Sequence, residues 1–139
     1  MNAKALMLLL LRCSVGIYLT VWGVNKLLNA NGAVRLSDTY YFGLISDGAV
    51  VSIVGILQII VGLAVAIGIF RKFSYVIHAA FWVVSTAPII LYLLDPLALY
   101  LVDQGRLTWF PSTTLVISSF LIIVFKEFDT MSLDNKLGK

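Results

Sequence analysis

The fold is decided by residues 10–27, which read L-L-R-C-S-V-G-I-Y-L-T-V-W-G-V-N-K-L. This stretch covers most of an apolar segment from about residue 5 to residue 26, which is long enough to cross a bilayer as a helix. Arg12 interrupts the apolar run and no A-x-A cleavage pattern follows. A secretory signal peptide would have such a pattern, so we expect a retained first membrane helix.

Three further apolar segments follow the first, at about residues 48–70, 73–94 and 111–125. The chain has 139 residues, of which 60% are hydrophobic and 12% charged, whereas soluble domains carry about twice that charged share. Arg71 and Lys72 are the whole link between the second and third segments, which must therefore be antiparallel neighbours. These features predict one all-α domain, an antiparallel up-down four-helix bundle in a membrane, with a flexible tail from about residue 127 to residue 139.

Two longer connections, residues 27–47 and 95–110, lie on the same side of the predicted bundle and are rich in aromatic residues. Asp95-Pro96 resembles a helix start, so a short helix lying in the membrane interface could form there, and the other connection could hold one as well. The two connections could together cap one end of the bundle. Ordinary anchoring of Tyr and Trp side chains at the interface is an equally good interpretation.

Basic residues predict the orientation of the chain, because cytoplasmic loops carry an excess of Lys and Arg. Six lie on the side that holds both termini, and three lie on the other side. Both termini are therefore expected in the cytoplasm. The basic residues occur singly or in pairs at segment edges, so they indicate membrane topology rather than a nucleic-acid surface. The six are Lys4, Arg71, Lys72, Lys126, Lys136 and Lys139, and the three are Lys26, Arg35 and Arg106.

Arg12 is the first candidate site residue, because an arginine near a helix centre costs about 2.5–3.5 kcal/mol on insertion scales. Its side chain could snorkel back to the surface, or it could face the bundle interior and bind an anion, a polar ligand or a partner group. Arg12, Gly16, Gly23 and Lys26 share one helix face, with Trp22 and Asn25 beside it near the outer end. Two glycines on that face permit close helix packing, which favours an inward Arg12.

The second and third segments supply further polar candidates. Gln58 lies near mid-membrane on a face with Gly55 and Gly62, and an unpaired amide there is costly. We expect it to have a polar partner, in a helix–helix hydrogen bond or, as the second interpretation, in a ligand. His78 and Trp82 share a face of the third segment, and a structural histidine is the default. Arg12 is expected to turn toward Gln58 and His78.

The single cysteine and the single histidine exclude several kinds of redox and metal site within one chain. Cys13 and His78 are the only cysteine and histidine, which rules out an intrachain disulfide, a CxxC pair, bis-histidine haem and a multi-histidine metal site. We therefore predict no metal site. All seven acidic residues fall outside the predicted spans, which argues against a cation-coupled transporter.

The chain resembles the DoxX family of small bacterial four-helix membrane proteins. The resemblance rests on the early arginine, the glycine and the G-x-x-K end within residues 10–27. It also rests on the glycine-rich run GILQIIVGLAVAIGIFRK over residues 55–72. It implies a membrane subunit or anchor for a redox or oxidative-stress partner in the bacterial inner membrane. Relatives commonly carry an acid where this chain has Gln58, so an ion pair between Arg12 and that position is not expected.

Two functions follow as hypotheses. The first is a membrane subunit, not an enzyme on its own, that associates with a redox partner or a second copy of itself and holds a quinone-like lipid. The inward-facing polar and aromatic groups could form the hydrogen bonds that such a head group needs. The second is a non-enzymatic scaffold or assembly factor whose polar residues only join helices, with a small-solute transporter as a weaker third option.

Overall fold

The computed structural model describes residues 3–138, which form helices with no strand among them. The long helices are α1 (Ala3–Leu28), α3 (Gly48–Ile67), α4 (Arg71–Thr86) and α6 (Pro111–Val124). A 3-10 turn, η1 (Ala87–Ile89), and a short helix, α5 (Ile90–Leu94), continue the path of α4. The predicted four spans are confirmed to within a few residues at each end.

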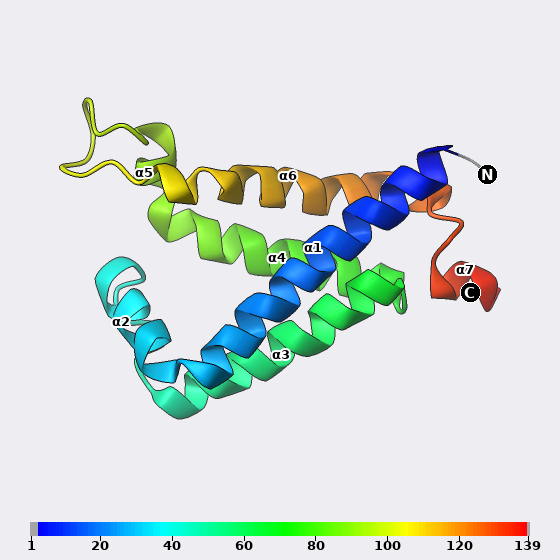
Figure 1. The fold of residues 1–139 in the computed structure, drawn as a ribbon, viewed down its shortest axis with the longest axis horizontal. Helices are drawn as coiled ribbons and strands as arrows, with labels where there is room; N and C mark the ends of the chain where they lie inside the picture. Colours follow the sequence, from blue (N-terminus) through cyan, green and yellow to red (C-terminus); the bar gives the residue numbers. More distant parts are fainter. Residues whose placement is uncertain (1–2, 139) are drawn as a thin grey trace.

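Four helical segments of residues 3–138 are long and apolar enough to cross a membrane: Ala3–Leu28, Gly48–Ile67, Arg71–Leu94 and Leu107–Val124. Successive segments run in opposite directions. Helix α1 packs against α3, and this pair lies at an angle to the pair formed by α4 and α6 (Figure 1). Large apolar side chains such as Ile60 and Ile117 remain exposed on the outside of the bundle. The protein is therefore a multi-pass membrane protein whose outer surface contacts lipid.

Glycines explain the close crossing of α1 and α3. A Cβ atom added to Gly16 would lie 2.6 Å from the carbonyl oxygen of Gly62, and one added to Gly23 would lie 2.5 Å from that of Gly55. Real side chains cannot approach a backbone so closely. The seven-residue spacing of the glycines on both helices thus brings the two backbones into direct contact.

The bundle has two distinct ends (Figure 1). The terminal end holds the start of α1, the turn between α3 and α4, a 3-10 turn η3 (Lys126–Phe128) and the short helix α7 (Leu133–Lys136). The loop end holds α2 (Ala30–Tyr40) and the connection that leads into η2 (Leu107–Trp109) and α6.

No helix forms directly after Asp95-Pro96, although these residues resemble a helix start. The carboxylate of Asp95 instead accepts hydrogen bonds from the backbone N–H groups of Leu99, Tyr100 and Leu101, at 2.7–2.8 Å. Ala98 has a positive φ of 58°, which a helix does not permit. A carboxylate that collects three N–H groups competes successfully with helix formation here. In the other connection a short helix does form, α2 (Ala30–Tyr40).

Asp95 predicts a pH dependence for this loop. The three N–H donors lower the pKa of Asp95 from 3.8 to about 2, so its stabilising effect is complete above pH 3.8 and disappears as the pH falls toward about 2. We expect hydrogen exchange of residues 99–101 to stay slow well below pH 3.8 and Asp95→Ala to make it fast at neutral pH. Asp103→Ala removes an exposed acid from the same loop and should change nothing. Fast exchange in the unaltered loop at neutral pH would contradict this assignment.

Candidate functional site

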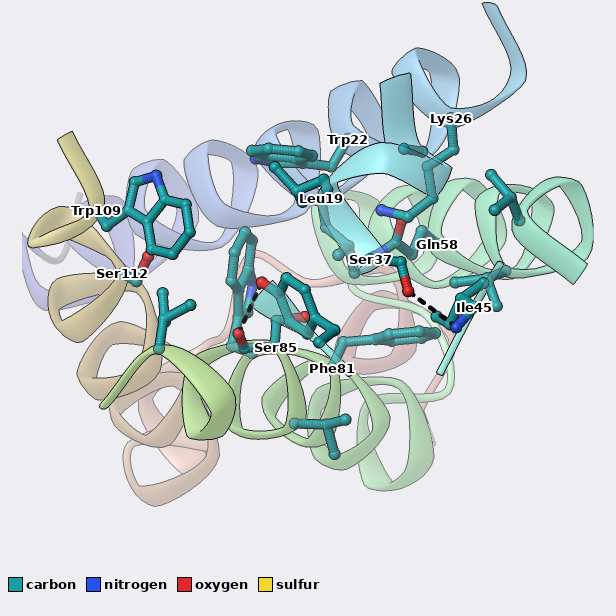
Figure 2. Close-up of a pocket in the computed structure, with 18 of the residues that line it drawn as sticks. Leu19, Trp22, Lys26, Ser37, Ile45, Gln58, Phe81, Ser85, Trp109 and Ser112 are labelled. Atoms are coloured by element: carbon teal, nitrogen blue, oxygen red, sulfur yellow. Dashed lines mark hydrogen bonds between the residues drawn. The ribbon is translucent and has the colours of Figure 1, made fainter. Parts of the chain in front are cut away.

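A cavity of about 360 Å³ lies in the loop-end half of the bundle, between α1, α3, α4 and the start of α6 (Figure 2). Residues of α2 and of the turn after it also line the cavity. Its volume falls within the range of small-molecule sites. No aspartate or glutamate lines it. The lining residues are Tyr18, Leu19, Trp22, Lys26, Ala33, Leu36, Ser37, Tyr41, Ile45, Val51, Val54, Gln58, Phe81, Trp82, Val84, Ser85, Ile89, Thr108, Trp109 and Ser112.

One wall of the cavity carries a cation and an amide. Lys26, in the last turn of α1, places its Nζ 5.4 Å from the centre of the Trp22 ring. The Cβ of Lys26 is close to Gly55, one turn from Gln58 on α3, so Lys26 and Gln58 share this wall (Figure 2). Gln58 is 4% exposed, and its Oε1 has no hydrogen-bond partner among residues 3–138. The expected helix–helix hydrogen bond to this oxygen is therefore not formed.

The segment after α2 closes over the cavity. The Tyr41 phenol donates a hydrogen bond to the Ser85 carbonyl of α4 at 2.9 Å, drawn as a dashed line in Figure 2. Burial raises the pKa of Tyr41 above its usual 10.0, so the phenol keeps the proton that it donates. Ser37 is buried, and its Oγ accepts the N–H of Ile45 at 2.9 Å, which holds the turn after α2 in place.

Aromatic rings form the other walls. Trp82 of α4 stacks on Tyr18 of α1, with ring centres 5.5 Å apart and planes 30° from parallel. At the loop end, Trp109 contacts Tyr40 and Tyr92 edge to face, with ring centres 4.3 and 5.6 Å away. The two outer connections thus contact each other over one end of the bundle.

Arg12 lies at the terminal end, apart from this cavity, and the expected orientation toward Gln58 and His78 is wrong. Its side chain is 2% exposed, so it faces the interior as expected. It donates to the carbonyls of Ile67, at 3.1 Å, and of Met131, at 3.3 Å, and lies 3.6 Å from the carboxylate of Asp129. Position 58 takes no part in an ion pair with Arg12, as expected, and the acid that pairs with Arg12 comes from the C-terminal segment instead.

The segment after Phe125 folds back onto the bundle instead of extending as a flexible tail. Ser132 caps α7, and the Asp134 carboxylate accepts the backbone N–H groups of Phe70, at 3.0 Å, and Arg71, at 2.8 Å. Those groups belong to the start of α4, where a helix has unpaired N–H donors. Asp129 also accepts the Tyr75 hydroxyl at 2.6 Å. Buried carboxylates with several donors hold this segment in place.

His78 and Asn25 lie outside the cavity. His78 is fully buried between α1, α4 and α6, and contacts the cavity only through Trp82. Asn25 is exposed, and its carbonyl accepts the N–H of Asn29 between α1 and α2. The structure thus brings four of the seven predicted residues together in one cavity: Trp22, Lys26, Gln58 and Trp82.

The residues on the other side of the cavity were not among the predicted site residues. Tyr41, Ser85 and Trp109 come from three different elements, and their meeting depends on how α2 folds back across the bundle. Their amphipathic residue types were visible, but interfacial anchoring explained them equally well.

Within residues 3–138, no group of three or more His, Cys, Asp or Glu side chains is placed to hold a metal ion. The sequence model of the DoxX family matches residues 7–93, more than half of the chain. This range contains α1 from residue 7 onward and all of α2, α3 and α4, and with them every one of the seven predicted site residues. No curated protein and no solved structure matches the chain. On the match over residues 7–93, the chain belongs to the DoxX family.

Proposed function

We propose that this chain is a membrane subunit that holds the head group of a quinone-like lipid in the loop-end cavity and anchors a redox partner at the bilayer. One observation carries the ligand part of the proposal, namely the buried Gln58 Oε1 without a partner. A buried acceptor that makes no hydrogen bond costs about 1–3 kcal/mol. A ligand that donates to Gln58 would recover that free energy.

The wall chemistry suits both redox forms of such a head group. A quinone carbonyl can accept from the Lys26 ammonium and from the amide N–H of Gln58, while a quinol hydroxyl can donate to Gln58 Oε1. A carboxylate at position 58 would only accept. The stacked pair of Trp82 and Tyr18 offers a flat aromatic surface to the ring, and the isoprenoid tail would lie among lipid chains.

The partner part of the proposal rests on the family and on the chain's own chemistry. The one cysteine provides no thiol pair, so we assign the redox reaction to the partner rather than to this chain. The charge bias supports a location of the termini, with the folded C-terminal segment, on the cytoplasmic side of a bacterial inner membrane. Crosslinking at exposed lysines of the terminal end, followed by mass spectrometry, should recover the partner.

A scaffold without a ligand is the second candidate, and one observation favours it. The Arg12 guanidinium pairs with Asp129 and donates to two carbonyls inside the chain, so this charge joins parts of the protein rather than binding a ligand. The scaffold hypothesis accounts for the terminal end but leaves Gln58 and the cavity unexplained.

The ligand proposal predicts stabilisation by a short-chain ubiquinone added to the purified protein in mild detergent. A ligand at 100 times its Kd adds about 2.7 kcal/mol, which raises the melting temperature. Gln58→Leu and Lys26→Met should each weaken this effect, with Kd increased about threefold to tenfold for one lost hydrogen bond. Ser52→Ala, which removes a hydroxyl of α3 that bonds Gly48 and does not line the cavity, is the matched control.

Two results would overturn the ligand part. One is the absence of any quinone among the lipids extracted from the purified protein, together with no shift on adding the probe. The other is a shift of the same size in Gln58→Leu, Lys26→Met and the unaltered protein.

A further inference from the structure

His78 is fully buried and does not line the cavity, yet it contacts the cavity wall through one side chain. Its Nδ1 lies 3.0 Å from the Ser119 Oγ of α6, and its Nε2 accepts the indole N–H of Trp82 at 3.2 Å. The same Nε2 lies 3.2 Å from the carbonyl oxygen of Val15 on α1. These contacts cannot all be hydrogen bonds at once, and working out which are formed assigns a role to His78.

Ser119 decides where the imidazole proton is. Its Oγ lies 2.7 Å from the Leu115 carbonyl oxygen and 3.0 Å from His78 Nδ1. We assign its one hydroxyl proton to the shorter contact, so toward His78 the Ser119 oxygen accepts. The proton of a neutral imidazole must then be on Nδ1. Nε2 keeps a lone pair, which accepts the Trp82 N–H. With no proton on Nε2, the Val15 contact is not a hydrogen bond, and this carbonyl belongs to the interior of a helix, where it has its backbone donor.

We infer that His78 is a positioning residue, which holds the Trp82 indole in the cavity wall by accepting its N–H. Trp82 is 7% exposed, and its ring stacks on Tyr18 across the α1–α4 contact. Without an acceptor at His78, a buried indole N–H would be unpaired, and the ring would have to turn to find another partner. The chain of contacts from Ser119 through His78 to Trp82 thus sets the shape of the aromatic wall, and its role in ligand binding rests on the proposed function.

Nitrogen-15 NMR of the imidazole tests the geometry without any ligand. His78 is the only histidine, so its two ring nitrogens give unambiguous signals, provided that purification uses no histidine tag. We expect a protonated Nδ1 and an unprotonated Nε2, with a through-bond coupling from Nε2 to the Trp82 N–H. A proton on Nε2 would overturn the inference, because Nε2 would then donate to Val15 and Trp82 would lose its acceptor.

A double-mutant cycle tests the effect on the cavity. His78→Asn should weaken binding of the short-chain ubiquinone about threefold to tenfold, as expected for one lost hydrogen bond. Trp82→Phe keeps an aromatic ring but has no N–H, so in that background His78→Asn should change the affinity no further. If His78 is purely structural, His78→Asn should lower thermal stability. It should then change the ubiquinone affinity by the same factor in the unaltered protein and in Trp82→Phe.

The two proposals fail in different ways. If the ubiquinone does not bind to the unaltered protein, the ligand proposal fails, and the tautomer of His78 still decides whether it holds Trp82. If the ubiquinone binds but His78→Asn weakens it equally with and without the Trp82 N–H, the positioning role is wrong and the ligand proposal stands.

Discussion

Asp129→Ala is expected to destabilise the protein by about 3–5 kcal/mol, because it leaves the Arg12 guanidinium buried without a counter-charge. Arg12 is 2% exposed and Asp129 3%, so neither water nor lipid head groups replace the lost partner. The same change removes the acceptor of the Tyr75 hydroxyl at 2.6 Å. The carbonyls of Ile67 and Met131 remain as acceptors, but they carry no net charge.

The loss should be measured by equilibrium unfolding in mixed detergent micelles. Glu127→Ala is the matched control, since Glu127 is an exposed acid two residues away and should change the free energy of unfolding by less than about 0.5 kcal/mol. Arg12→Leu combined with Asp129→Leu removes both charges and should recover most of the lost stability. Equal destabilisation by the control and by Asp129→Ala would show that the ion pair contributes nothing.

Gly62→Val is expected to destabilise the bundle by about 3 kcal/mol, the upper end of the usual overpacking range. A Cβ atom at Gly62 would lie 2.5 Å from the carbonyl oxygen of Gly16 and 2.8 Å from the backbone nitrogen of Thr20. Both atoms belong to the backbone of α1, so no side-chain rotation relieves the overlap. The two helices would have to separate, and their other glycine contact, between Gly23 and Gly55, would open with them.

Gly48→Ala provides the matched control for the same helix. Nothing lies within 4 Å of a Cβ atom at Gly48, so alanine should be neutral or should stabilise the helix by up to about 1 kcal/mol. Unfolding in mixed micelles measures both variants. If Gly62→Val unfolds at the same denaturing detergent fraction as Gly48→Ala, α1 and α3 do not cross at these glycines.

The four spans and the glycine face of α1 were predictable because each depends on a local pattern, namely apolar length or helical spacing. The ion-pair partner of Arg12 was not predictable in this way, because Asp129 lies more than 100 residues away in a segment without a periodic pattern of apolar residues. One clue was available in the sequence. All acids lie outside the spans, so an inward Arg12 near the terminal end could pair only with an acid of the turns or the tail, and Asp129 and Asp134 are both in the tail.

Part of the candidate site was also predictable from a local pattern, the spacing of residues along one face of a helix. Trp22, Lys26, Gln58 and Trp82 follow from helix faces, and they share the cavity. His78 has the same face as Trp82, but its place behind the wall depends on Ser119 of α6, which helical spacing within α4 cannot indicate. Asn25 lies only one residue from Lys26, yet the 100° turn per residue places it on the exposed side.

The pairing of Arg12 with Asp129 also bears on biogenesis. Arg12 enters the membrane with the first helix, whereas Asp129 is synthesised after all four spans. Throughout translation of the intervening chain, the arginine has no acidic partner from its final fold. A ribosome product that stops before residue 129 therefore carries a cation in its first helix without the acid that pairs with it in the finished protein.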